Sequence, residues 1–347
     1  SGERGIFNRE AAIKQVESIG RRDSDHLFGC NPCSEIILRD GQFCNLTEVV
    51  VRETDTEETL IRKVKLATIL GTFQSTLTEF KYLRKIWKDN TEEERLLGVS
   101  LTGIMDNALL SGKSARIGNN IEGLLTKLRE TAVETNRKVS AKLGIPQSTA
   151  VTTVKPSGTV SQLVDSASGI HARHNSHYIR TVRGDNKDPL TQFMVAQGIP
   201  SEPDVMKPQS TTVFSFPMQA PSTAVFRQDM TAIEQLNIWL KYQTYWCEHK
   251  PSVTISVKEH EWLEVGAWVY EHFDEVSGIS FLPFSEHTYK QAPYQDCTEV
   301  EYKEMLNKMP KGIDWRALSE FEKEDTTSGS RELACTAGVC EVVDISA

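Results

Sequence analysis

The stretch AVTTVKPSGTVSQL, residues 150–163, predicts a buried strand, a glycine-containing turn and the start of a helix. The turn contains Pro156, Ser157, Gly158 and Thr159. A turn that opens a helix exposes unpaired backbone N–H groups, and its hydroxyls add donors, so it suits an anion of phosphate size. The segment is not a P-loop, because Lys155 precedes the glycine instead of following it. A simple turn without a ligand is the alternative.

The rest of the chain alternates helices with short strands in the same way. The spacing of apolar residues predicts helices at 57–88, 91–105, 121–143 and 232–249. Capping boxes for the second and fourth of these are Thr91 with Glu94 and Thr231 with Glu234. Besides 150–154, β-branched runs predict strands at 211–216 and 253–257. This alternation indicates an α/β architecture that contains parallel strands.

Composition excludes several classes of protein. The chain has 347 residues and a net charge of −9, from 39 Lys and Arg against 48 Asp and Glu. The acidic balance argues against nucleic-acid binding, which needs a clustered positive field. No apolar run approaches the roughly 20 residues of a membrane span, and the first ten residues hold no secretion signal, so we expect a cytoplasmic protein. Those residues also lack an initiator Met, from which we expect a cut, processed or spliced precursor.

Cysteines are the main candidates for chemistry. The seven are Cys30, Cys33, Cys44, Cys247, Cys297, Cys335 and Cys340. In a reducing compartment, clustered cysteines indicate catalysis, redox exchange or metal binding rather than structural disulfides. We expect Cys247 and Cys297, which stand alone, to be small buried residues.

The most informative cluster is Asn31-Pro32-Cys33-Ser34-Glu35. Pro32 fits neither a helix nor a central strand, so we expect Cys33 on a loop. A carboxylate two residues away raises the pKa of the Cys33 thiol, which disfavours a thiolate nucleophile. A thiol that stays protonated is suited to donate a hydrogen atom, and Glu35 is then free to act as a base on another atom. Cys44, eleven residues on, would supply an electron and a proton.

Three other interpretations use the same cysteines. Cys33 could be a packing residue without chemistry. Cys30 and Cys33 form a C-x-x-C pair typical of thioredoxin-like proteins, but Pro32 and the apolar run after it argue against the helix that this motif opens. A four-thiolate zinc site would combine this pair with Cys335 and Cys340, whose C-x4-C spacing and distance along the chain argue against it.

The end of the chain carries a second pair of thiols. Residues 322–332 are polar and contain glycine and serine, which predicts a flexible linker with a reach of about 20 Å. Cys335 and Cys340, which follow it, are separated by four small or flexible residues and could close into a disulfide. A tether of this length raises the local dithiol concentration towards the millimolar range, which suits a shuttle of reducing equivalents. A frayed terminus with incidental cysteines is the alternative.

Three histidines at spacings of three raise the possibility of a metal site. They are His171, His174 and His177. Because Arg173 and Arg180 lie among them and would oppose a cation, we expect structural or surface histidines instead.

Taken together, several motifs resemble adenosylcobalamin-dependent (class II) ribonucleotide reductases, and most closely their ribonucleoside-triphosphate branch. The motifs are FGCNPCSEIIL at 28–38, QFCNLTEVV at 42–50, VKPSGTVSQLVDSASGIHARH at 154–174, WCEHKPSVTI at 246–255, SGISFLP at 277–283 and ELACTAGVC at 332–340. The likeness covers the whole chain but only the second half of a normal catalytic chain. It departs from the family pattern at Cys30, where threonine is usual, and at Ala172, where proline is common.

The resemblance implies a fold and a set of partners. Residues 1–321 would form the second half of a ten-stranded α/β barrel with a central finger loop, and 322–347 a flexible tail. The complementary N-terminal half, with the partner thiol of Cys44, would come from elsewhere. Adenosylcobalamin would be the cofactor, a ribonucleoside triphosphate or diphosphate the substrate, and thioredoxin the reductant. No D-x-H-x-x-G motif is present, so we expect cobalt to keep the cofactor's own base and no residue here to bind a metal.

The resemblance also implies roles for individual residues. Cys33 would become the thiyl radical that takes the 3′ hydrogen of the ribose. Glu35 would be the base for the 3′ hydroxyl, and Asn31 a hydrogen-bonding partner of the ribose. Cys44 would belong to the reducing pair, and the turn at 156–159 would hold the substrate phosphates. The tail thiols, Cys335 and Cys340, would re-reduce the site.

Two rival functions remain open. A class I catalytic fragment is disfavoured, because no Tyr-Tyr pair is present to relay a radical from a second subunit. An inactive, thiol-rich assembly module is the rival that is not an enzyme.

Overall fold

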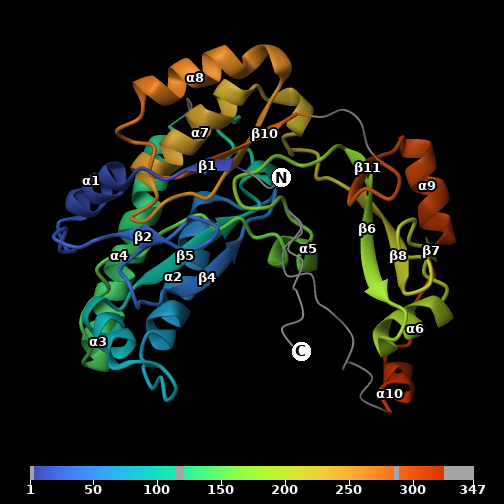
Figure 1. Ribbon diagram of the computed structural model, residues 1–347, viewed down its shortest axis with the longest axis horizontal. Coiled ribbons are helices and arrows are strands. Elements are labelled where there is room, and N and C mark those ends of the chain that lie inside the picture. The colour runs from blue at the N-terminus through green and yellow to red at the C-terminus, as the bar shows by residue number, and fades with distance from the viewer. Residues whose placement is uncertain (1–3, 114–119, 285–288, 324–347) are drawn as a thin grey trace. The chain divides into compact units, whose positions relative to one another are not determined.

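A computed structural model of the chain describes residues 4–113, 120–284 and 289–323 (Figure 1). The chain divides into two compact units, which are described separately. Unit 1 takes in residues 1–173 and 222–284, and unit 2 takes in 174–221 and 285–347. The α/β class predicted above is confirmed, whereas the boundary at 321 stays a prediction.

Unit 1 holds most of the helices and all of the parallel strands that the structure describes. Its strands are β1 (Arg4–Ile6), β2 (Gly29–Cys30), β3 (Ile37–Leu38), β4 (Asn45–Val50), β5 (Leu97–Thr102), β9 (Thr254–Val257) and β10 (Ile279–Pro283). Its helices are α1 (Arg9–Ile19), α2 (Glu57–Gln74), α3 (Lys85–Glu94), α4 (Ile121–Leu143), α5 (Val160–Leu163), α7 (Ala232–Tyr245) and α8 (Trp262–Glu271).

The parallel strands of unit 1 belong to two sheets, which the segment at 150–154 joins through isolated bridges. β4 pairs with β5 in parallel from Asn45 opposite Leu97 to Val50 opposite Thr102. Bridges at Thr152 and Val154 place the predicted strand at 150–154 between β5 and the start of β9. β10 continues the sheet in parallel to β9, and β1 closes its end in the antiparallel direction. The described strands of unit 1 form no closed barrel, so the ten-stranded barrel stays a prediction.

Helices of unit 1 pack on this sheet and on one another. α2 contacts β4, β5 and α4; α4 in turn contacts α7, which packs on β9 and α8 (Figure 1). The predicted helix at 121–143 is confirmed as α4 and ends at Gly144 in the left-handed conformation that glycine adopts easily. Its buried face recurs at helical spacing, through Ile121, Leu124, Leu125, Leu128 and Ala132.

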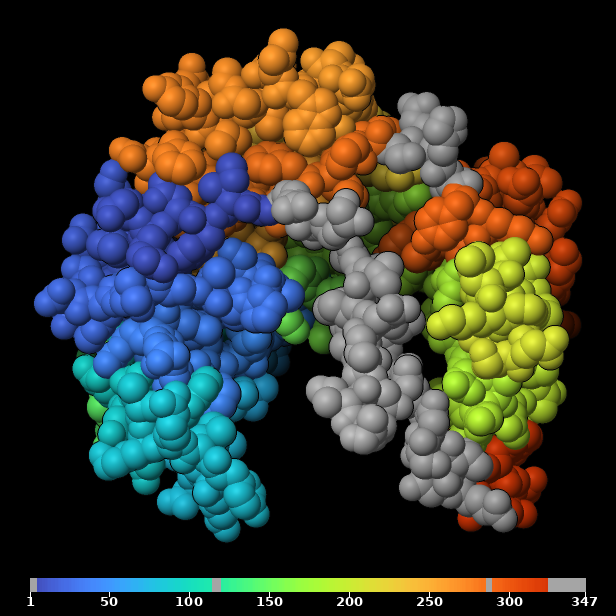
Figure 2. All heavy atoms as spheres, in the orientation of Figure 1, coloured from blue at the N-terminus to red at the C-terminus, as the bar shows by residue number. Residues whose placement is uncertain are grey.

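The predicted helix at 57–88 was wrong in its bounds, and the predicted helix at 91–105 was wrong in its type. α2 ends at Gln74. The carbonyl of the next residue, Ser75, accepts a hydrogen bond from the buried Arg95 guanidinium at 2.7 Å. In a continuing helix it would accept from a backbone amide of the following turn. The apolar residues beyond it kept the helical spacing, but they lie in a loop at the surface of unit 1, cyan in Figure 2, where Leu77 and Tyr82 are exposed.

The predicted capping box at Thr91 is instead the last turn of α3. Glu94 does not cap a helix, because its carboxylate is buried against Arg22. Residues 97–102 form the strand β5, in which all six residues are buried, as is usual for a parallel strand covered on both faces. The capping box at Thr231 is confirmed, but its helix, α7, ends at Tyr245 rather than at 249.

Unit 2 is built on an antiparallel sheet. Its strands are β6 (His177–Asp185), β7 (Ser201–Pro203), β8 (Thr211–Gln219) and β11 (Tyr294–Asp296), in the order β11-β6-β8-β7. Its helices are α6 (Pro189–Ala196), α9 (Glu299–Lys308) and α10 (Leu318–Phe321). The predicted strand at 211–216 is confirmed within β8. Phe193 of α6 is buried against the rings of Trp315 and Phe321.

None of the helices described for either unit combines the length and the apolar character that crossing a membrane requires. The predicted redox tail, with Cys335 and Cys340, lies outside the described residues.

Candidate active site

The cluster around Cys33 forms a tight turn, residues 31–35, which is called the thiol turn below. It joins β2 to β3, which pair in the antiparallel direction with Cys30 opposite Ile37. The Ser34 amide donates to the Asn31 carbonyl at 2.8 Å, and Ser34 has a φ of 66°, in the left-handed region. The loop predicted from Pro32 is therefore confirmed. A strand rather than a helix follows it, which does not fit the thioredoxin-like interpretation.

Asn31 and Glu35 contact each other across the thiol turn. The Asn31 side-chain amide donates to the Glu35 carboxylate at 2.6 Å, and its own oxygen accepts from the Ile36 amide at 2.9 Å. Glu35 is 1% exposed, whereas Cys33 is exposed. The turn therefore holds a fixed carboxylate and amide beside a thiol that a ligand can reach.

Cys44 belongs to the same electrostatic neighbourhood. Burial raises the pKa of the Cys44 thiol strongly, the positive charge of Arg22 opposes that rise, and the negative charge of Glu35 adds to it. The structure thus brings Cys44 close enough to Glu35 for their charges to interact. A thiol with so high a pKa stays protonated at neutral pH and reacts poorly as a thiolate.

A buried ion pair that the sequence did not reveal supports the thiol turn from behind. Arg22 donates to both Glu94 carboxylate oxygens, at 3.0 and 2.9 Å, and to the Ile37 carbonyl at 2.9 Å. Gln42 also donates to the Glu94 carboxylate. Because Arg22 and Glu94 are 72 residues apart, only the fold brings them together. They fasten the β2–β3 hairpin to α3.

Replacing Glu94 by glutamine is expected to lower the free energy of unfolding by about 3–5 kcal/mol, because it leaves the Arg22 charge buried without a counter-charge. Chemical denaturation monitored by circular dichroism measures the change. Asp89→Asn is the control on the same helix: Asp89 pairs with Lys85 at the surface, so a loss of about 0–1 kcal/mol is expected. Equal losses in the two variants would contradict this assignment.

The predicted phosphate turn follows the strand at 150–154, which contacts the thiol turn directly. The Thr153 hydroxyl donates to the Glu35 carbonyl at 3.0 Å, so the two motifs lie within one neighbourhood. In the turn itself Ser157 is buried with a φ of 53°. The helix that follows, α5, has four residues, so its dipole adds little to the binding of an anion.

A carboxylate beside the phosphate turn was not predicted. Burial raises the pKa of Glu48, on β4, while the Ser157 hydroxyl and the charge of Lys155 partly offset that rise. Lys155 is held through its amide, which donates to the Ser100 hydroxyl of β5 at 2.8 Å. A negative charge here would oppose an anion, so a protonated Glu48 suits phosphate binding better than an ionised one.

Two of the three histidines, His171 and His174, contact other groups of the protein. His171 is held by its two ring nitrogens, one 3.0 Å from the Ser168 carbonyl and one accepting from the Thr254 amide at 3.0 Å. Burial lowers its pKa. His174, which belongs to unit 2, lies 3.0 Å from the Asp296 carboxylate. Among the described residues, no group of three or more His, Cys, Asp or Glu has the geometry to hold a metal ion.

The remaining cysteines lie apart from the thiol turn. Cys247 is buried, as expected, and its burial raises the pKa of its thiol strongly. Cys297, in unit 2, is only half-buried, so the expectation that it is a buried residue was wrong. The zinc interpretation depends on Cys335 and Cys340, which lie outside the described residues.

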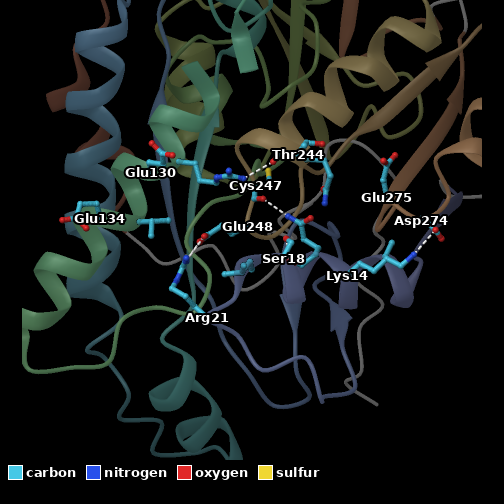
Figure 3. A pocket seen from close by; sticks show the side chains of 16 residues that line it. Lys14, Ser18, Arg21, Glu130, Glu134, Thr244, Cys247, Glu248, Asp274 and Glu275 are labelled. Carbon is cyan, nitrogen blue, oxygen red and sulfur yellow. Dashed lines mark hydrogen bonds and ion pairs between the residues drawn. The ribbon is translucent and has the colours of Figure 1, made fainter. Parts of the chain in front are cut away.

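A cavity of about 860 Å³ lies elsewhere in unit 1, lined by residues of α1, α4 and α7 (Figure 3). Its charged side chains are largely paired: Arg21 contacts Glu248 at 2.7 Å and Lys14 contacts Asp274 at 2.9 Å. Neither Cys33 nor Glu35 lines it, and its cysteine, Cys247, has a thiol that stays protonated. We therefore place the candidate active site at the thiol turn and not in this cavity.

Comparison with known proteins confirms the resemblance inferred from the motifs. The chain is 26% identical over 374 residues to an adenosylcobalamin-dependent ribonucleoside-triphosphate reductase of Lacticaseibacillus paracasei, covering 99% of this chain and 49% of that protein. It is 28% identical over 313 residues to the protein of that name from Euglena gracilis, covering 89% of this chain and 41% of the relative. The chain spans about half the length of the curated relatives it matches. No family profile matches it.

Solved structures agree. A B12-dependent (class II) ribonucleotide reductase crystal structure matches with a TM-score of 0.77 and 25% identity, over 92% of this chain and 48% of that one. The alpha subunit of the class Id ribonucleotide reductase of Actinobacillus ureae matches with a TM-score of 0.52 at 13% identity, over 82% of this chain and 59% of that one, which is a likeness of fold alone.

Proposed function

We propose that the chain supplies the thiol-bearing part of an adenosylcobalamin-dependent ribonucleotide reductase, which converts ribonucleoside triphosphates to 2′-deoxyribonucleotides for DNA synthesis. The names of the relatives support the activity, the substrate class and the cofactor. The observation that carries the proposal is the thiol turn, in which an exposed Cys33 lies beside the hydrogen-bonded pair of Asn31 and Glu35.

The residues of the turn have separate tasks in this reaction. The Cys33 sulfur takes a hydrogen atom from C3′ of the ribose and returns it at the end. Glu35 accepts the proton of the 3′ hydroxyl, while the Asn31 amide keeps its carboxylate in place. Cys44 and a second thiol are oxidised to a disulfide, and their two electrons and two protons replace the 2′ hydroxyl with hydrogen and release water. Residues 156–159 hold the phosphates.

The exposure of Cys33 suits a radical source that comes from outside the core of unit 1. Adenosylcobalamin, when bound, supplies that radical, which no side chain generates unaided. The buried Cys247 thiol would be unsuitable for the same task. The tail thiols Cys335 and Cys340 would then reduce the Cys44 disulfide and pass it to thioredoxin, which fits a cytoplasmic protein.

A complementary segment, on the same or another polypeptide, is part of this proposal, because the matched relatives are about twice as long. Within the described residues, the outer edge of β4 has no strand partner. Beside it lies an exposed apolar stripe, which Leu66, Leu70 and Phe73 form on α2 and Leu77 continues in the loop after the helix. A groove of about 470 Å³ lies between the strand and this stripe. These features suit a second set of strands that completes the ten-stranded barrel around the finger loop.

Replacing Leu70 and Leu77 together by lysine is expected to weaken binding of the complementary segment roughly 10²- to 10⁴-fold, because two buried leucines contribute about 3–6 kcal/mol. The two side chains are 63% and 71% exposed in this chain alone. Titration calorimetry measures the affinity. Leu263→Lys, on α8, is the control: it is 90% exposed away from β4 and should bind normally. Unchanged affinity in the double variant would place the interface elsewhere.

The proposed function is tested by reconstitution. The chain is combined with the complementary segment, adenosylcobalamin, a ribonucleoside triphosphate and a dithiol, and chromatography follows the deoxyribonucleotide product. We expect product from the full mixture and none when the complementary segment or the cofactor is left out. Absence of product from the complete, assembled mixture would refute the reductase assignment, and product from the chain alone would refute the need for a complementary segment.

A further inference from the structure

Lys250 is a buried lysine that the mechanism above does not use. It lies in the segment after α7, is 0% exposed, and forms no ion pair in the part of the chain that the structure describes. Its amide donates to the Glu35 carbonyl at 3.1 Å. A buried ammonium group without a counter-charge is costly, so its position calls for an explanation.

The Lys250 ammonium is aimed at the thiol turn. Its Nζ donates to the Ser34 hydroxyl at 3.0 Å and to the Ser277 carbonyl at 3.4 Å. The ring of Phe7 lies against its other side, 4.6 Å from Nζ to the ring centroid. Ser34 is the residue between Cys33 and Glu35, so this hydrogen bond is made at the centre of the turn.

Two further features match this contact. Ser34 holds a left-handed φ of 66°, which is unfavourable for a residue with a side chain and needs support from its surroundings. Gly278 lies directly against the pair: a Cβ there would overlap the Ser34 hydroxyl and lie 2.9 Å from the Lys250 Nζ. A glycine at 278 therefore leaves the space in which the ammonium meets the hydroxyl.

We propose that Lys250 is a positioning residue that holds the thiol turn in its strained conformation, and so sets the placement of Cys33 relative to Glu35. The ammonium binds the Ser34 hydroxyl, and Ser34 in turn fixes the backbone on both sides of itself. The contribution to catalysis rests on the proposed function, whereas the contribution to the conformation of the turn does not.

The ionisation of Lys250 offers a way to test this. Burial lowers its pKa to about 8, and the nearby charges of Cys30 and Glu35 partly offset the effect. On its own segment the charged neighbour to consider is His249, whose pKa burial lowers to about 3, so that it is neutral above pH 7. The other contacts, from Phe7, Ser277 and Gly278, carry no titratable side chain. The ammonium is therefore present below about pH 8 and is lost as the pH rises.

Hydrogen exchange of the Ser34 and Ile36 amides reports on the turn, since both donate to Asn31. Measurement by mass spectrometry with fragmentation is made in a Cys30→Ser background, which removes the thiol whose charge acts on Lys250. We expect protection to fall about tenfold between pH 7 and 9.5, the size of effect that a lost charged hydrogen bond produces. In Lys250→Met, protection should already be about tenfold lower at pH 7 and should not fall further.

Two further variants keep the test decisive. Ser34→Ala removes the hydroxyl that accepts from Lys250, so its amide protection should match that of Lys250→Met. Combining the two substitutions should cause no further loss of protection. If Lys250→Met does not fold, Ser34→Ala tests the same hydrogen bond. Lys241→Met, at a surface lysine of α7 that pairs with Glu122, should behave as wild type. Wild-type protection in Lys250→Met, or a pH dependence that persists in it, would overturn the inference. Because this readout needs no turnover, a failed reductase assay leaves it unaffected.

Discussion

Replacing Cys33 by serine is expected to abolish deoxyribonucleotide formation in the reconstituted enzyme, with a loss of at least about 10⁴-fold. The reason is the strength of the bonds: an S–H bond is weak enough to exchange hydrogen reversibly with a ribose carbon, whereas a serine O–H bond is not. The substitution preserves size and exposes a hydroxyl where an exposed thiol stood, so the thiol turn should keep its fold. Product formation by chromatography measures the loss.

The controls for this variant are the other thiols outside the proposed chemistry. Cys30→Ser removes the neighbouring thiol at the end of β2, and Cys297→Ser removes one from unit 2. Both should retain most of the activity. Unaltered turnover in Cys33→Ser would favour the rival interpretation, in which this cluster serves assembly rather than catalysis.

Replacing Glu35 by glutamine is expected to slow turnover by about 10²- to 10⁴-fold, the range over which a positioned general base contributes. Glutamine keeps the volume of the buried side chain, but it cannot accept the proton of the 3′ hydroxyl. Its oxygen can still accept from the Asn31 amide, which lies 2.6 Å from the carboxylate in the wild-type chain. Steady-state rates at saturating substrate measure the effect on the chemical steps.

Glu93→Gln is the matched control, since Glu93 lies on α3 with its side chain 60% exposed. Its rate should stay within about twofold of wild type, as is usual for surface substitutions away from a site. If Glu35→Gln were as active as this control, the carboxylate would have to be removed from the mechanism. A loss confined to KM would instead indicate a part in binding.

Local sequence signals were sufficient where the interactions are local. Pro32 predicted the loop, and the spacing of Asn31, Cys33 and Glu35 places all three on one turn, so their proximity needed no knowledge of the fold. α4 was predicted at its observed bounds because a regular apolar face and Gly144 mark it without ambiguity.

Signals that depend on the fold were misread or missed. Residues 97–102 form a strand that is buried on both faces. The apolar residues of this segment also fit a helical spacing, so the pattern alone did not reveal the strand. Lys250 reaches the site from a distant part of the chain, and nothing near it in the sequence marks it as a neighbour of the thiol turn. Lys250 lies 216 positions from the Ser34 hydroxyl that it binds. Such contacts become visible only when the sheet has brought the segments together.

The free edge of β4 has a consequence for how this protein must be made. An unpaired parallel edge beside an apolar helix face is a template for indiscriminate strand addition, and a newly synthesised copy would offer it to any other copy nearby. Lys63, whose ammonium binds the Val50 carbonyl at 2.9 Å, shields one end of this edge. If the proposed complementary segment covers the remainder, its presence during synthesis would protect new copies from pairing with one another.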